Sequence, residues 1–308
     1  MIGRLACGLG LFAGSLLTGW SLGRVGLLTD GRAKRVIRFV MKRISPIVLC
    51  LSFWRLSITG MGSLVLPVIG CLTACLALIP AWGYARAAHL SRPQTGSFLT
   101  CAMFSNVGFL GAFVAFALYG ELAYGLAMWY LVFFNPCFYL VGFGLARRFG
   151  SRAPAAGTSG DAFADELRLY PFLGLCLGLG LSLAKVPRPA GCEIINHLLI
   201  PVETALYLSA IGSQVTYEPL GRWLRPCVVM SMIKFWYGPM VGWGLAALFH
   251  VEGLPRAIVL LQGAMPVAMS PLMLPLLFNL DRKLSVALWL FTTLLAIPWL
   301  LLYLPLIH

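Results

Sequence analysis

Polar residues and glycines interrupt the apolar segment FSNVGFLGAF at positions 104–113, which contains Ser105, Asn106, Val107 and Gly108. A second apolar segment, LLQGAMPVAMSPLMLPLL, carries three prolines within ten residues, at positions 266, 271 and 275. Proline removes an intrahelical hydrogen bond and clashes with the preceding turn, so an uninterrupted helix is not expected there. An amide side chain and the free N–H groups of a helix start both bind carboxylates.

The two interrupted segments supply the candidate substrate-binding residues, which are Ser105, Asn106, Val107, Gly108, Met265, Pro266, Ser270 and Pro271. A half-helix that starts at each interruption would direct unpaired N–H groups and the positive end of its dipole at an anion. Glycine spacing alone is also typical of close helix packing. The pairing of two interruptions therefore favours a binding site more than either segment does alone.

Two ionisable residues, Glu203 and Lys234, fall well inside apolar runs. Such a residue costs at least ~2.5–3.5 kcal/mol at the centre of a membrane helix, so a functional role is the default hypothesis. We expect the two to pair in one state and separate in another, with Glu203 accepting a coupling proton. A permanent ion pair, or snorkelling of Lys234 to the interface, is the alternative. Gln262 and Asn135 are polar residues near the expected crossover, where each would bond a neighbouring helix or a ligand.

The composition places these segments in lipid. Of the 308 residues, 60% are hydrophobic and 11% are charged, and the mean hydropathy is +0.88. Soluble domains carry roughly 25% charged residues, so much of this surface must face a bilayer. The net charge is +13, but the basic residues cluster between apolar runs, as in loops that set membrane topology. A nucleic-acid partner is therefore not expected.

At about 20 residues per span, ten helices are expected, over 4–23, 36–57, 61–85, 97–119, 122–146, 169–186, 194–216, 225–249, 254–278 and 284–305. The loops after the odd-numbered helices hold fourteen basic residues, and the opposite side holds five. This bias predicts that the odd-numbered loops are cytoplasmic and that both termini lie outside.

A polar linker over 151–168 divides the chain into five-helix halves, 1–150 and 169–308. Four positions of the first half match four of the second at offsets of 155 to 162 residues: Pro46 with Pro201, Pro80 with Pro239, Asn106 with Pro266, and Pro136 with Pro298. Because each half has an odd number of spans, the second half would enter the membrane from the opposite side. The pattern predicts an inverted repeat with interruptions in its fourth and ninth helices.

The segment SNVGFLGAFVAFALYGELAYGLAMWYLVFFNPCFYLVGFGLA resembles the fourth and fifth helices of the auxin efflux carrier family, which includes PIN-type plant carriers and bacterial permeases. LIPVETALYLSAIGSQV, VVMSMIKFWYGPMVGWGLA, and LLQGAMPVAMSPLML followed by NLD are similar to its helices 7, 8 and 9. The resemblance implies an all-α integral membrane fold of ten transmembrane helices, a 5+5 inverted repeat in which broken helices 4 and 9 cross. It also implies a scaffold of helices 1, 2, 6 and 7, a transport domain of helices 3–5 and 8–10, a homodimer and a bacterial inner membrane.

By this resemblance, Asn106, Val107, Gly108 and Pro266 fall on the family's crossover and are implied to hold a substrate carboxylate. The chain departs from the family at three places. Ser105 stands where the family often has glycine, residues 112–113 replace a frequent proline, and residues 270–271 stand near a frequent asparagine. These differences change the shape and polarity of the pocket.

The expected function is secondary transport of a small organic anion, an auxin- or malonate-like carboxylate, by alternating access, with a proton favoured over sodium as the coupling ion. The alternatives are a sodium- or proton-coupled symporter or exchanger of the bile-acid-symporter or sodium/proton-antiporter type, and a non-transporting membrane sensor. The interrupted helices carry no acid at their centres, which disfavours a cation as the main cargo. No HExxH motif or paired carboxylate occurs, so neither an enzyme nor a metal or other cofactor is expected.

Overall fold

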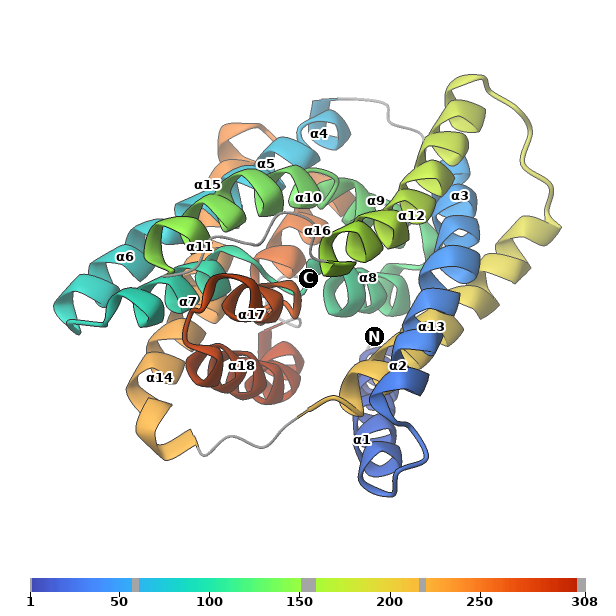
Figure 1. The fold of residues 1–308 in the computed structure, drawn as a ribbon. Coiled ribbons are helices and arrows are strands. Elements are labelled where there is room, and N and C mark those ends of the chain that lie inside the picture. Colours follow the sequence, from blue (N-terminus) through green and yellow to red (C-terminus); the bar gives the residue numbers. More distant parts are fainter. Residues whose placement is uncertain (1, 57–60, 151–158, 216–219, 304–308) are drawn as a thin grey trace. The chain divides into compact units, whose positions relative to one another are not determined.

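The computed structural model describes residues 2–56, 61–150, 159–215 and 220–303 (Figure 1). These residues form helices and connecting loops, and the β pairing among them is one isolated bridge. Among the described residues, five helices are long and apolar enough to cross a membrane: Ala6–Arg24, Leu66–Ala87, Glu121–Phe149, Gly191–Gly212 and Arg282–Tyr303. Two shorter apolar helical segments are Val107–Tyr119 and Leu169–Leu183. The fold is therefore that of an all-helical integral membrane protein, as expected, whereas the ten-helix inverted repeat stays a prediction.

Several expected spans are divided in the structure. The span expected over 61–85 is formed by α4 (Met61–Leu64), α5 (Leu66–Leu76) and α6 (Leu78–Ala87). Pro80 explains the second division, because it has no N–H to offer the carbonyl of Leu76 four residues earlier. The hydroxyl of Tyr237 donates to that carbonyl instead, at 3.2 Å. A distant side chain thus satisfies the group that the proline leaves open.

The chain divides into two compact units, each built from three segments. Unit 1 comprises Met1–Ile58, Ala112–Gly125 and Ala156–Tyr217. Unit 2 comprises Thr59–Gly111, Leu126–Ala155 and Glu218–His308. Both units therefore draw on both halves of the sequence, and the boundary between them does not follow the linker at 151–168.

Unit 1 contains α1 (Ile2–Arg24), α2 (Asp30–Phe39), the π-helical turn η1 (Val40–Ile44), α3 (Ser45–Arg55), α8 (Ala112–Tyr119), the start of α9 (Glu121–Tyr130), α12 (Ser159–Leu183) and α13 (Gly191–Gly212). Within this unit α3 packs along α12, and α1 packs along α13 (Figure 1). A Cβ atom at Gly174 or Gly178 would collide with the backbone of α3, so these glycines allow the two helices to touch. Because α12 begins at Ser159, the linker expected over 151–168 is helical in its second part; residues 151–158 lie outside the described residues.

Unit 2 contains α4 to α7, with α7 spanning Arg92–Met103, then η2 (Val107–Gly111), α10 (Phe134–Cys137), η3 (Phe138–Gly142), α11 (Phe143–Phe149), η4 (Leu220–Trp223), α14 (Leu224–Met232), η5 (Ile233–Tyr237), α15 (Gly238–Leu248), α16 (Gly253–Gly263), η6 (Ser270–Met273), α17 (Leu274–Phe278) and α18 (Arg282–Tyr303). Here η2, η3 and η5 are π-helical, and η4 and η6 are 3₁₀ turns.

In unit 2, local sequence signals determine where α7 begins, where α17 ends and where α18 begins. α7 starts where Ser91 donates its backbone N–H to the side chain of Gln94 at 3.1 Å, with Pro93 in the first turn. α17 ends at Phe278, and the next residue, Asn279, adopts the left-handed conformation that closes a helix. Asp281 then caps α18 by accepting the N–H of Leu284 at 3.0 Å. The sequence NLD is thus the turn that joins these two helices.

A buried aromatic cluster holds the point at which α7 ends. The ring of Phe104 lies 5.1 Å from the ring centres of both Phe134 and Phe138, in edge-to-face arrangements. Phe278 belongs to the same buried core. Such pairs contribute about 0.5–1.5 kcal/mol each beyond burial. The chain after Met103 is therefore anchored by packing on one side of the interruption.

Candidate functional site

The two interruptions expected from the sequence are present, and the interrupted segments lie against each other within unit 2. α7 ends at Met103, and residues 104–106 are not helical before η2 begins at Val107. α16 ends at Gly263, and irregular backbone continues to Ser270.

The two irregular segments pair as a short antiparallel bridge between Ser105 and Val267. The N–H of Asn106 donates to the carbonyl of Pro266 at 2.7 Å, and the N–H of Ala268 donates to the carbonyl of Phe104 at 2.9 Å. Backbone groups at membrane depth must be satisfied within the protein. Each break therefore supplies hydrogen-bond partners for the other.

Asn106 is buried, and its side chain closes the start of the helical segment that follows the break. Its Oδ1 accepts the N–H of Leu110 at 3.3 Å, and its backbone carbonyl accepts the N–H of Gly111 at 3.0 Å. Both N–H groups are therefore engaged within the protein. In this structure Asn106 acts as a helix cap, and the ligand contact expected of its amide stays a prediction.

A cavity of ≈ 50 Å³ lies beside this junction. Of the expected site residues, Ser105, Val107, Lys234 and Gln262 line it. Its walls are otherwise mostly apolar and include Met103, Phe104, Tyr130, Leu131, Phe134, Cys71 and Cys137. Among the described residues that line the cavity, Lys234 is the only charged one.

The other expected site residues lie outside the cavity lining. Met265, Pro266 and Pro271 are buried, while Gly108 and Ser270 are partly buried. Asn135 lies in α10 with its side chain exposed. The structure therefore brings four of the expected residues to one cavity and leaves Asn135 away from it.

Lys234 is 2% exposed and lies in the π-helical turn η5. Its Nζ donates to the carbonyl of Ala102 at 2.6 Å and to the hydroxyl of Ser105 at 2.9 Å. Single π-helical turns are frequent at functional sites. The ammonium group therefore sits at the end of α7, where the interruption leaves carbonyl oxygens without helical partners.

Gln262 connects the two interrupted segments on another side of the cavity. Its Nε2 donates to the carbonyl of Val107 at 3.1 Å. Its Oε1 is buried and has no hydrogen-bond partner among the described residues. A Cβ atom at Gly111 would collide with this oxygen, so glycine is required there for the side chain of Gln262 to fit.

Glu203 is 6% exposed and belongs to unit 1, whereas Lys234 belongs to unit 2. The carboxylate of Glu203 accepts hydrogen bonds from the hydroxyl groups of Ser45 and Tyr124, both in unit 1. Each member of the expected ion pair thus has partners within its own unit. The pairing of Glu203 with Lys234 stays a prediction.

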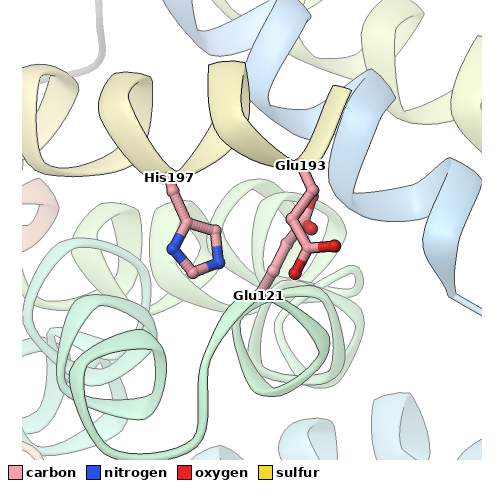
Figure 2. Close-up of side chains that lie close together, drawn as sticks. All are labelled: Glu121, Glu193 and His197. Atoms are coloured by element: carbon pink, nitrogen blue, oxygen red, sulfur yellow. The ribbon is translucent and has the colours of Figure 1, made fainter. Parts of the chain in front are cut away.

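Unit 1 holds a second polar cluster, in which Glu121, Glu193 and His197 place their ligand atoms within 4.8 Å of one another (Figure 2). Such a set is able to hold a metal ion. Glu121 is nevertheless engaged already, because Arg188 donates to its two oxygens at 2.5 and 3.1 Å and Asn196 donates to one of them.

Arg55 also lies 3.0 Å from Glu193 and 3.5 Å from Glu121. Two arginines thus balance the two carboxylates of this cluster. A cation would have to displace them, so we interpret the arrangement as an ion-pair network.

Two features of these sites were missed from the sequence. The sequence did not indicate that Lys234 bonds to Ala102 and Ser105 at the interruption of α7. It also gave no sign that Glu121, at the start of α9, is 3% exposed and lies at the centre of a charge network. Sequence spacing carries no signal for either, since the partners are distant in the chain and come together only in the fold.

Comparison with known proteins finds similarity to membrane transporters. Residues 170–304 match the family described as membrane transport protein. An uncharacterized transporter of Methanothermobacter thermautotrophicus is 24% identical over 268 residues, which cover 86% of each chain. An uncharacterized transporter of Methanocaldococcus jannaschii is 25% identical over 281 residues, covering 87% of this chain and 88% of the relative. These matches agree with the resemblance carried by the sequence motifs, and the chain is similar to membrane transport proteins.

Proposed function

We propose that the protein is a secondary transporter that moves a small organic anion, a carboxylate, across the membrane by alternating access. The observation that carries the proposal is the junction of two interrupted helices beside a cavity lined by Lys234. Irregular backbone at membrane depth is tolerated where it lines a cavity, and interrupted helices in corresponding positions mark the substrate sites of transporters. The match to the membrane transport family adds support.

The proposed architecture is a ten-helix inverted repeat with the crossover at its centre. Asn106 and Pro266, which bond to each other, are 160 residues apart and correspond between the two halves. We assign unit 1 as the scaffold, because the first, second, sixth and seventh expected helices fall in it. We assign unit 2 as the moving part, although the fourth and fifth expected helices contribute to both units.

The remaining details of the proposal follow from the loop charges and the family resemblance. The odd-numbered loops face the cytoplasm and both termini lie outside, in a bacterial inner membrane. The protein forms a homodimer. Substrate binds at the crossover, and movement of unit 2 against the scaffold then exposes it to the other side.

We assign Glu203 as the acceptor of a coupling proton. Its carboxylate is buried and accepts hydrogen bonds from two neutral hydroxyl groups. Because neither donor carries a charge, the carboxylate is able to gain and lose a proton without breaking an ion pair at these two contacts. Sodium is the less favoured coupling ion. No acid is among the described residues that line the cavity, which also disfavours a cation as the cargo.

Counterflow in liposomes tests this function. Purified protein is reconstituted with an unlabelled carboxylate inside, and uptake of the same labelled carboxylate is followed, with acetate, malonate and indole-3-acetate as separate probes. We expect at least one probe to accumulate transiently. An imposed proton gradient should change this accumulation, and a sodium gradient should not. Flux of protons or sodium that no carboxylate alters would contradict the proposal and favour an exchanger.

A further inference from the structure

A single buried ammonium group lies at the junction of the interrupted helices. Lys234 is 2% exposed, and its Nζ contacts two neutral oxygen atoms, those of the Ala102 carbonyl and the Ser105 hydroxyl. An ammonium group has three N–H donors, so these two bonds leave one donor. No aspartate or glutamate is among the described residues that line the same cavity. The positive charge therefore lacks a full counter-charge at this site.

The neighbours of Lys234 offset its charge only in part. Ala102 lies in the last turn of α7, where the helix dipole is negative and favours a cation. This dipole amounts to roughly half an elementary charge, and it falls off within the last turn. A carboxylate that enters the cavity would supply the remaining negative charge and accept the free N–H. The hydrogen bond would be of the short, charge-assisted type.

The size and walls of the cavity fit one such group. A volume of ≈ 50 Å³ has room for a few water-sized groups, which is the size of a carboxylate head. The wall residues Phe104, Tyr130 and Leu131 offer apolar surface and no second positive charge. A second carboxylate on the same ligand would be buried without a partner, which is strongly unfavourable.

We propose that Lys234 is the counter-charge of the transported anion and restricts the site to cargo with one negative charge. This inference rests on the proposed function. It assigns to a side chain the role that was expected of half-helix N–H groups. The same ammonium group would then have two roles, because it bonds to the end of α7 and also binds the negative charge of the cargo.

Charge selection by the unmodified protein is the first test, because it needs no variant. Binding is measured as the rise in unfolding temperature of the purified protein with propionate, malonate or propionamide at equal concentrations and at pH 7.5. We expect propionate to stabilise at about tenfold lower concentration than malonate or propionamide. Equal or tighter binding of malonate would overturn the inference.

Lys234→Gln is the second test, and Lys283→Gln is its matched control, since Lys283 is an exposed lysine of the same unit. We expect Lys234→Gln to weaken propionate binding by about tenfold to a hundredfold, which is the usual effect of losing a hydrogen bond to a charged group. Binding of propionamide should not change by more than about twofold, and the control should bind both as before. An unchanged preference for propionate in Lys234→Gln would overturn the inference.

Lys234→Arg covers the case in which the neutral variant does not fold. A guanidinium group keeps the charge, so we expect the preference for propionate over propionamide to persist. Loss of that preference in a folded Lys234→Arg protein would overturn the inference.

Transport separates this inference from the function on which it rests. If the unmodified protein transports carboxylates and Lys234→Gln transports them with the same apparent affinity, the inference fails and the function stands. If the unmodified protein neither binds nor transports any carboxylate probe, both fail.

Discussion

The backbone N–H of Asn106 donates to the carbonyl oxygen of Pro266 at 2.7 Å, and this bond joins the two interrupted helices at their breaks. The residues are 160 positions apart in the sequence. The bond shows why a membrane protein tolerates the polar and proline-rich segments that contain them. Each interruption satisfies backbone groups of the other, and the pair creates an irregular centre beside a small cavity.

Asn106→Ala removes the Oδ1 that accepts the N–H of Leu110. Loss of such a cap costs about 0.5–2 kcal/mol, so we expect a lower unfolding temperature and weaker carboxylate transport. Asn135→Ala is the control, because Asn135 is exposed on α10. Thermal unfolding of the two purified variants checks the prediction. Equal unfolding temperatures would show that the cap does not stabilise the break.

Gly111→Ala places a methyl group where Gln262 Oε1 lies. The side chain of Gln262 must then move and give up its bond to Val107, so we expect transport to fall by an order of magnitude or more, since buried overpacking costs about 1–3 kcal/mol. Gly83→Ala is the control, because a Cβ there meets no atom within 4 Å. Adding Gln262→Ala to Gly111→Ala should restore part of the activity. Full activity of the single variant would refute this account of the contact.

Glu203→Gln keeps the shape of the side chain and removes its ability to exchange a proton. If Glu203 carries the coupling proton, an imposed pH gradient should no longer drive accumulation, while counterflow of substrate persists. Ser45→Ala is expected to keep the coupling and shift its pH midpoint, because it removes one hydrogen bond to the carboxylate. Accumulation against pH, measured in liposomes, checks both variants. A pH profile that Glu203→Gln leaves unchanged would exclude the coupling role.

Glu121→Ala leaves Arg188 without the carboxylate that it contacts at 2.5 Å. Breaking a buried pair by removing one partner costs about 3–5 kcal/mol, so we expect a large drop in the unfolding temperature. Glu193→Ala is the matched control, because the Glu193 side chain is 52% exposed and such exposed pairs contribute about 0–1 kcal/mol. Similar losses in both variants would argue against a central role for Glu121.

The positions of the two breaks were predictable because Gly, Pro and Asn alter local backbone preferences wherever they occur. Composition and hydropathy likewise predicted an all-helical membrane protein. The partners of Lys234 were not predictable, since Ala102 is 132 residues away and offers only a backbone carbonyl. The division of the span over 61–85 was likewise only partly predictable. Local sequence showed Pro80, but not the hydroxyl of Tyr237 that satisfies the open carbonyl.

Asn106 illustrates the limit of sequence reasoning at a single residue. Its amide was expected to hold a carboxylate, and its burial at the break agrees with a place near the site. In the structure the amide oxygen caps the following helical segment, and the contact of the amide N–H₂ group with a ligand stays a prediction. Residue type and position in the chain do not distinguish these uses, because both need a polar side chain at a helix start.

The most direct test of the central claim is the electrical current of proteoliposomes on a solid support after a jump in carboxylate concentration. Mono- and dicarboxylates are applied with and without proton and sodium gradients, to the unmodified protein, Asn106→Ala and Lys283→Gln. We expect a current with at least one carboxylate, reduced in Asn106→Ala and kept in Lys283→Gln. Silence across all carboxylates, together with a current driven by sodium or protons alone, would contradict the account and favour a cation exchanger.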